Sequence, residues 1–229
     1  MVTVLTDFEK RVTEIELFFK HLENLEEKGA LLYFPNRTRN KYLSHNNELI
    51  KILKANVFLL LYNLAESSIR QSLAEIYDTI TSENLTYQEV IDEIKKIWIV
   101  QNHKNFRNLG IDNIFTAINQ LANETIDIKF DSEKLISGNV DGRKIREFSD
   151  KHGFSERTHR NAKNGNKLHQ IKTQRNNLAH GNTSFAECGR VYTILQLRET
   201  KKEVILYLRN ILRNIKTYLD NREYAIVNT

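Results

Sequence analysis

The feature that most constrains the fold is a long segment, from Asn46 to Ile80, that contains neither Pro nor Gly. Its central run VFLLLY, from Val57 to Tyr62, would be apolar on every side of a helix. A helix that is apolar all round is normally buried, so other elements must pack around it. The sequence therefore predicts a helical domain built around this segment.

Several other segments have the apolar spacing of helices. In Val4–Lys28, apolar residues recur at steps of three and four. Only one Pro and eight Gly occur in 229 residues, a composition that favours long helices. Further helices are expected at Thr86–Val100, Ile111–Leu121, Asp141–His152, Leu168–Ala179 and Thr193–Tyr218.

Two segments lack this spacing. Ala30–His45 contains the only Pro and is expected to be an irregular connection. Ile126–Phe130 alternates like a strand, but a lone strand forms no sheet, so an extended loop or small hairpin is expected. We therefore expect an all-α, antiparallel helical bundle with additional helices and a basic, loop-rich side. Residues 1–229 would form one domain, with residues 1–45 as an N-terminal helical extension.

The basic side corresponds to the interval from Gly138 to His180. This interval has ten Lys and Arg against four Asp and Glu, and it holds four of the seven His. Such a concentration favours a polyanionic partner, although a solvated surface would have the same composition. The segment Ser155–Lys167 is polar and aperiodic, so we expect a mobile loop that is either a phosphate clamp or a plain linker.

The segment IKTQRNNLAHG, from Ile171 to Gly181, combines several groups that suit phosphate chemistry. Arg175 is a planar cation that can grip two phosphate oxygens, and Asn176 and Asn177 add neutral donors and acceptors. His180 adds an imidazole, the side chain that most often serves as a general acid or base. Gly181 is expected to cap the helix that ends here, so that Arg175 and His180 are not held on opposite faces.

The string RNNLAHG resembles the R-x4-H signature of the HEPN superfamily. Two further stretches, Asn56–Tyr77 and Ser137–Phe154, resemble a bacterial stand-alone branch of it, of the toxin or defence kind. The resemblance covers most of the chain from about residue 46 to residue 224. It implies that Arg175 and His180 are catalytic, with Asn176, Asn177 and Glu66 in support. Glu66 interrupts the apolar pattern of the long helix, and a Glu there is tolerable chiefly beside a cation such as Arg175.

By this resemblance, the chain is a metal-independent endoribonuclease and a homodimer with a composite active site. It would act in toxin–antitoxin or antiviral systems and could be restrained by a partner protein. An RNA path would be lined by basic residues: Arg143, Lys144, Arg146, Arg157, Arg160, Lys163, Lys167 and Lys172. Two alternatives stay open: a non-catalytic HEPN module that binds RNA or a nucleotide, and a helical adaptor whose dimer is the function.

Other classes of function lack support in the sequence. Cys188 is the only cysteine, and the histidines form no HExxH or paired Cys/His pattern, so neither a metal nor a cofactor is expected. Nothing supplies a base for Cys188 as a nucleophile, and Tyr192 suits packing at least as well as catalysis. No apolar run has the length of a membrane span or signal peptide, so we expect a cytoplasmic protein.

Overall fold

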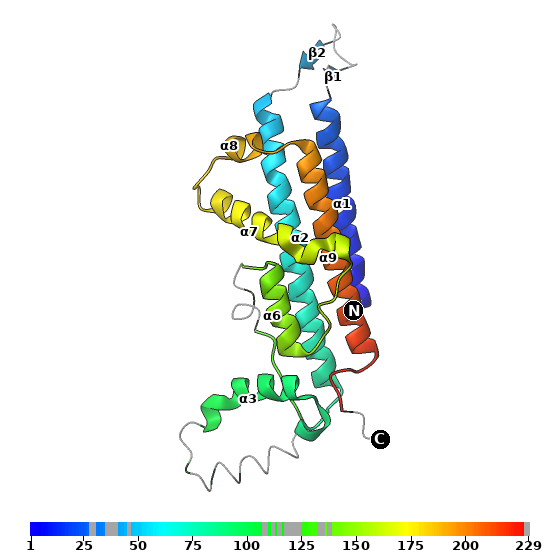
Figure 1. The fold of residues 1–229 in the computed structure, drawn as a ribbon, viewed down its shortest axis with the longest axis vertical. Helices are drawn as coiled ribbons and strands as arrows, with labels where there is room; N and C mark the ends of the chain where they lie inside the picture. The colour runs from blue at the N-terminus through cyan, green and yellow to red at the C-terminus, as the bar shows by residue number, and fades with distance from the viewer. Residues whose placement is uncertain are drawn as a thin grey trace.

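Three long helices form the frame of the computed structural model, which describes residues 1–27, 31–34, 41–44, 47–106, 110, 113, 116, 125–131, 136 and 139–226. They are α1 (Val2–Glu26), α2 (Asn47–Ser82) and α9 (Ile194–Asp220). α1 runs antiparallel to the other two, which share a direction (Figure 1). The predicted all-α bundle is thus confirmed, with two of its three long helices parallel.

The core lies between these three helices. The α1 stripe predicted from its spacing is buried, from Phe8 at 1% exposure to Leu22 at 0%. In α2, Val57, Phe58 and Leu61 are each 0% exposed, as expected for a helix within the core. Residues of α1 thus belong to the same core cluster as α2 and α9.

The connection between α1 and α2 differs from expectation. It contains strands β1 (Leu31–Phe34) and β2 (Lys41–Ser44), which pair antiparallel with Leu31 opposite Ser44. The prediction of a wholly irregular Ala30–His45 was wrong. The short strands have no clear period-2 pattern, and their pairing is a non-local contact that the sequence did not reveal.

The next region was predicted correctly in part. Thr86 and Glu89 form the expected capping box, but it begins only the short 3-10 helix η1 (Tyr87–Glu89). Val90 is extended, and α3 (Asp92–Phe106) starts after it, so a single helix over Thr86–Val100 was wrong. Residues 126–130 are an extended loop, in which the Lys129 backbone N–H donates to Gln101 Oε1 at 2.9 Å. The helix expected at Ile111–Leu121 lies almost entirely outside the described residues.

A second layer lies along one side of α2 (Figure 1). It consists of α6 (Gly142–His152), α7 (Asn166–Ala179) and the unpredicted short helix α8 (Phe185–Arg190). The expected caps of α6 are present: Asp141 accepts from the Lys144 backbone N–H at 2.9 Å, and Gly153 is left-handed at φ 86°. The boundaries predicted for α6 and α9 hold to within about two residues, because their capping residues are local signals.

The segment Ser155–Lys167 is more ordered than expected. It contains the 3-10 helix η2 (Arg160–Gly165), and α7 begins at Asn166. Asn214 of α9 donates to the backbone oxygens of Ser155 and Arg157, at 2.8 and 2.7 Å. The sequence showed no sign of this order in the segment expected to be a mobile loop, because the bonds come from a helix almost sixty residues later in the chain.

A membrane span requires a helix that is both long and strongly apolar. Within the described part of the chain, no helix is both long and apolar enough to cross a bilayer.

Candidate active site at the end of helix α7

The site is built on the way α7 ends. Gly181 is left-handed, with φ 70°, and its N–H donates to Leu178 O at 3.3 Å. The N–H of Asn182 reaches back to Asn177 O at 2.9 Å, which completes a Schellman cap. His180 is the C-cap residue and already has left the helical path, at φ −93° and ψ 1°. The sequence RNNLAHG thus specifies both the cationic side chain and the turn that follows it.

Arg175 is held against the long core helix α2. Its guanidinium carbon lies 4.3 Å from the centre of the Tyr62 ring, and Nη2 lies 3.6 Å from Glu66 Oε2. Nη1 also donates to Asn176 Oδ1 at 2.8 Å. The Arg175 side chain is 28% exposed, so these contacts hold it in place while part of the guanidinium stays open to solvent.

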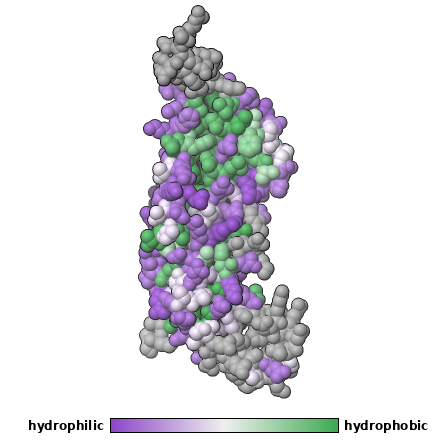
Figure 2. All heavy atoms as spheres, turned by 180° about the vertical axis from the view of Figure 1, so that it is seen from behind, coloured by the Kyte–Doolittle hydropathy of each residue, from purple (hydrophilic) through white to green (hydrophobic). Residues whose placement is uncertain are grey.

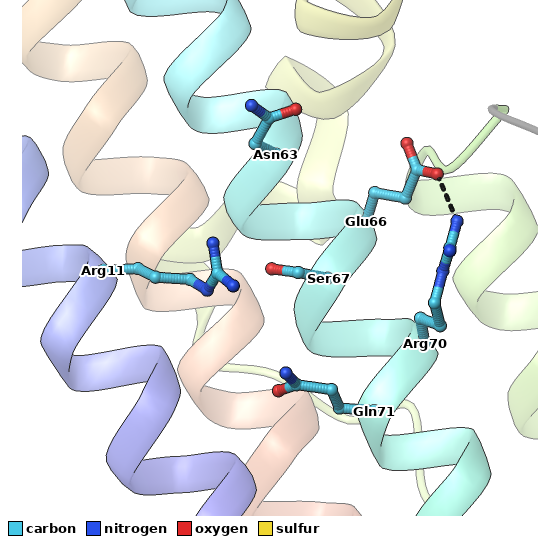
Figure 3. A pocket seen from close by; sticks show the side chains of 6 residues that line it. All are labelled: Arg11, Asn63, Glu66, Ser67, Arg70 and Gln71. Carbon is cyan, nitrogen blue, oxygen red and sulfur yellow. Dashed lines mark hydrogen bonds and ion pairs between the residues drawn. The ribbon is translucent and has the colours of Figure 1, made fainter.

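Glu66 connects this site to a polar hollow between α1 and α2 (Figure 3). Its Oε1 accepts from Arg70 Nη2 at 2.7 Å, while Oε2 faces Arg175. Figure 3 shows Arg70 on one side of Glu66 and Arg11, which comes from α1, on the other side of the helix. Glu66 therefore contacts two cations, which agrees with the expectation that this interrupted position faces Arg175.

His180 is exposed beyond the end of α7. Its backbone N–H donates to Asn176 O at 3.0 Å, whereas no hydrogen bond joins its ring to any described residue. Among the described residues, the side chains of His180 and Arg175 of the same chain form no hydrogen bond with each other. The described residues thus leave the exposed imidazole open to a substrate or a second protein chain.

The two Asn residues differ in their contacts. The Asn176 side chain accepts a hydrogen bond from Arg175 and so helps to orient the guanidinium. Asn177 contributes its backbone oxygen to the helix cap. Both side chains are only partly buried.

Tyr192 and Cys188 both contact Gln174, the residue of α7 that precedes Arg175. The Tyr192 hydroxyl accepts from Gln174 Nε2 at 3.1 Å, and its ring centre lies 4.8 Å from that of Phe58. Cys188 is buried against Gln174, and burial raises the pKa of its thiol. A thiol that is hard to ionise is a poor nucleophile, so the contacts of Cys188 suit packing rather than catalysis.

Half of the eight basic residues proposed for an RNA path already form ion pairs. Lys172 binds the buried Asp141 carboxylate. Burial acts to raise the pKa of Asp141, but the hydrogen bonds from Lys172 and from the Lys144 backbone amide outweigh it, so the pKa is lowered. Lys163 Nζ lies 3.2 Å from Glu203 Oε2, and Arg143 and Lys144 share Glu147. These pairs neutralise much of the charge that the sequence suggested.

The remaining members of the set are Arg146, Arg157, Arg160 and Lys167. Arg146 Nη1 donates to the backbone oxygen of Asn164 at 3.1 Å, and Lys167 Nζ donates to Gln170 at 3.3 Å. Arg157 and Arg160 are exposed. No described acidic side chain forms an ion pair with any of these four.

Three residues of the site were missed by the sequence analysis: Tyr62, Arg70 and Gln174. Tyr62 and Arg70 lie four residues before and after Glu66, so one helical turn places all three on one face. That spacing was a usable signal. Gln174 is different, since its partners on α8 and beyond are known only from the tertiary structure.

Over the described ranges, no group of three or more His, Cys, Asp and Glu is placed to hold an ion.

The all-α fold and the R-x4-H motif at the end of α7 define the chain as a HEPN-type protein. The family model for MAE_28990-like HEPN matches residues 2–224, and the chain belongs to this family. The match includes α1 as well as the motif. No curated protein and no solved structure is significantly similar to the chain.

Proposed function

We propose that the protein is a metal-independent endoribonuclease. The observation that carries this proposal is the contrast at the end of α7: Arg175 is fixed by Tyr62 and Glu66, whereas His180 is exposed. A fixed cation suits the stabilisation of a charged transition state, and an accessible imidazole suits proton transfer. Membership of the HEPN family supports a role in RNA or nucleotide chemistry.

The reaction starts at a ribose 2′-OH. His180 removes the hydroxyl proton, and the 2′ oxygen attacks the neighbouring phosphorus to form a P–O2′ bond. The P–O5′ bond breaks, and the departing 5′ oxygen takes a proton from a general acid. Arg175 stabilises the negative charge that builds up on the phosphoryl oxygens. The products are a 2′,3′-cyclic phosphate and a 5′-OH, and DNA is excluded because it lacks the nucleophile.

The general acid is assigned to a second copy of the chain. One protomer supplies one R-x4-H motif, and His180 makes no described side-chain hydrogen bond within it. In a twofold dimer, His180 of the partner subunit would donate the proton while the first His180 accepts one. The upper half of the back face has a patch of hydrophobic residues over the long helices, which offers apolar area for such an association (Figure 2).

A nuclease of this kind would be harmful to the cell that makes it. We place it in the cytoplasm, in a toxin–antitoxin or antiviral role, where a partner protein or a trigger restrains it. Growth arrest on expression, relieved by His180→Ala, would support this role.

The test is cleavage of total RNA by purified protein in EDTA, with determination of the product ends. Wild type should leave cyclic phosphates, and His180→Ala and Arg175→Ala should each lose at least about a hundredfold in rate. His21→Ala and Arg213→Ala are matched controls, because both residues are exposed and lie on α1 and α9. Their rates should equal that of the wild type.

Three other outcomes would change the conclusion. RNA binding that needs Arg175 but is never followed by cleavage would favour a non-catalytic HEPN module. A stable dimer that neither binds nor cuts RNA would favour a helical adaptor. Cleavage by His180→Ala at the wild-type rate would exclude the end of α7 as the active site.

A further inference from the structure

A second site lies near the start of α7, where α6, η2 and α9 meet. It is a hollow of about 640 Å³, which we call the basic pocket. Residues from five different segments line it: Arg146, Glu156, Arg157, Thr158, Asn164, Asn166 and Tyr207. Neither Arg175 nor His180 is among them, so the basic pocket is separate from the candidate active site.

The Tyr207 hydroxyl in the wall of this pocket makes no hydrogen bond with regular geometry to a described residue, and its polar neighbour there, the Arg146 guanidinium, cannot accept its proton. The side chain is 1% exposed. Burial raises the pKa of Tyr207 to about 12, although Arg146 acts to lower it, so at neutral pH the hydroxyl keeps its proton and can donate. A buried donor without an acceptor is costly, and such a group calls for a bound acceptor.

One wall of the basic pocket is a turn with an unusual backbone conformation. Lys163, Asn164 and Gly165 are left-handed in succession, at φ 44°, 54° and 69°. A side chain at Gly165 would come within 2.9 Å of the Tyr207 ring, so this turn lies directly on the tyrosine. Two consecutive non-glycine residues in this conformation are strained, and strain of this kind is typical of functional sites.

The segment that carries Arg157 is anchored to α9. Asn214 holds the backbone at Ser155 and Arg157, and the His159 backbone N–H donates to Asn210 Oδ1 at 3.4 Å. Because these bonds anchor the backbone, the Cα position of Arg157 is fixed relative to α9. The pocket is thus preorganised, which lowers the entropic cost of binding a ligand.

The chemistry of the lining favours an anion. Arg146 and Arg157 contribute two positive charges, whereas Glu156 contributes one negative charge. Arg146 uses one N–H for Asn164 O and has others to offer, while Thr158 and Asn166 supply neutral donors. Two guanidinium groups with several neutral donors are the usual environment of a phosphate.

We propose that the basic pocket binds a phosphate group, with Arg157, Arg146 and the Tyr207 hydroxyl as its donors. The phosphate could belong to an RNA strand that also reaches Arg175, or to a free nucleotide. The two sites lie at opposite ends of the same helix, nine residues or about 14 Å apart along its axis. The first source rests on the proposed RNA function, whereas the second does not.

Two probes separate these sources. One is a labelled RNA hexamer with 2′-O-methyl riboses, which has every phosphate but cannot be cleaved through a 2′-OH. The other is AMP. Dissociation constants of both would be measured for wild type, Arg157→Gln and Tyr207→Phe, by fluorescence anisotropy and calorimetry. Arg213→Gln is the matched control, because it removes an exposed positive charge elsewhere on α9.

For a strand phosphate, Arg157→Gln should weaken hexamer binding about tenfold, and Tyr207→Phe about threefold or more. The slope of log affinity against log salt should also fall by about one for Arg157→Gln. For a free nucleotide, the same losses should appear with AMP and not with the hexamer. Either pattern supports the basic pocket, and neither depends on cleavage.

Two results would overturn the proposal. One is equal affinity of wild type, Arg157→Gln and Tyr207→Phe for both probes, which would also follow if a trapped water satisfied Tyr207. The other is an equal loss in Arg157→Gln and Arg213→Gln, which would reveal unspecific attraction by the net charge. If the wild type binds the hexamer but cleaves no RNA, the proposed ribonuclease function is wrong, whereas the phosphate site in the basic pocket is unaffected.

Discussion

The guanidinium of Arg175 lies over the ring of Tyr62, 4.3 Å from its centre, and the ring belongs to the buried central run of α2. A cation over an aromatic face gains about 0.5–2 kcal/mol, depending on desolvation. The contact also fixes the direction of the guanidinium, because Tyr62 is 1% exposed and cannot move freely. The position of the proposed catalytic Arg175 thus depends on the core.

This relationship predicts different effects for two substitutions of Tyr62. Tyr62→Phe keeps the ring under Arg175 and should retain most of the ribonuclease activity. Tyr62→Leu removes the ring and should reduce kcat about five- to tenfold, since about 1 kcal/mol of orientation is lost. Single-turnover cleavage of a defined RNA, with circular dichroism to verify folding, measures both. Equal kcat in the two variants would show that the ring does not orient Arg175.

The orphan hydroxyl of Tyr207 leads to a prediction about stability without ligand. Tyr207→Phe should leave the free energy of unfolding unchanged or raise it by about 1 kcal/mol, because it removes an unsatisfied buried group. Tyr218→Phe should lower it by about 1 kcal/mol, since the Tyr218 hydroxyl donates to His152 O at 2.6 Å. Urea unfolding of the two variants makes the comparison. A clear loss in Tyr207→Phe would mean that the hydroxyl has a partner.

The close approach of α8 to α2 predicts a difference between two glycines. A Cβ on Gly189 would lie 1.8 Å from the backbone oxygen of Lys51, so Gly189→Ala must push α8 away and should cost about 2–3 kcal/mol. Around Gly181 nothing lies within 4 Å, and Gly181→Ala should cost only about 1 kcal/mol for its positive φ. Thermal or urea unfolding tests this order, and the reverse order would contradict the packing of α8.

His152 predicts how stability changes with pH. It is 0% exposed, and burial lowers its pKa from 6.5 to about 4. Between these values the unfolded chain binds a proton that the folded protein does not, so stability rises with pH over this range. About 3 kcal/mol should therefore be lost as the pH falls from 6.5 to 4.

The check is urea unfolding at pH 7.0, 5.5 and 4.5 for wild type and His152→Gln. Gln can still bond to the Phe148 oxygen or the Tyr77 hydroxyl, the partners of the His152 ring, but it does not titrate. The difference between the two proteins should shrink toward acidic pH, which isolates His152 from the carboxylates. A constant difference would show that the histidine is protonated in the folded state too.

Sequence patterns identified the parts of the protein that depend on local interactions. The apolar stripe of α1, the buried run in α2 and the caps at Asp141 and Thr193 were all predicted and are all present. The cap at Gly181 was predicted as well, because a left-handed residue after a helix has a recognisable sequence. The pairing of Glu66 with Arg175 was predicted from the cost of burying a lone carboxylate.

Only the tertiary structure decided what depends on distant segments. The β1–β2 hairpin is one example, since its strands have no periodic signal in the sequence. Two others join residues far apart in the chain: the anchoring of Ser155 and Arg157 by Asn214, and the basic pocket around Tyr207. The same holds for the pairing of Lys163 with Glu203 and of Lys172 with Asp141, which turned predicted phosphate ligands into structural contacts. Local sequence determines helices and their ends, whereas the partner of a charged or buried polar side chain is set by packing between them.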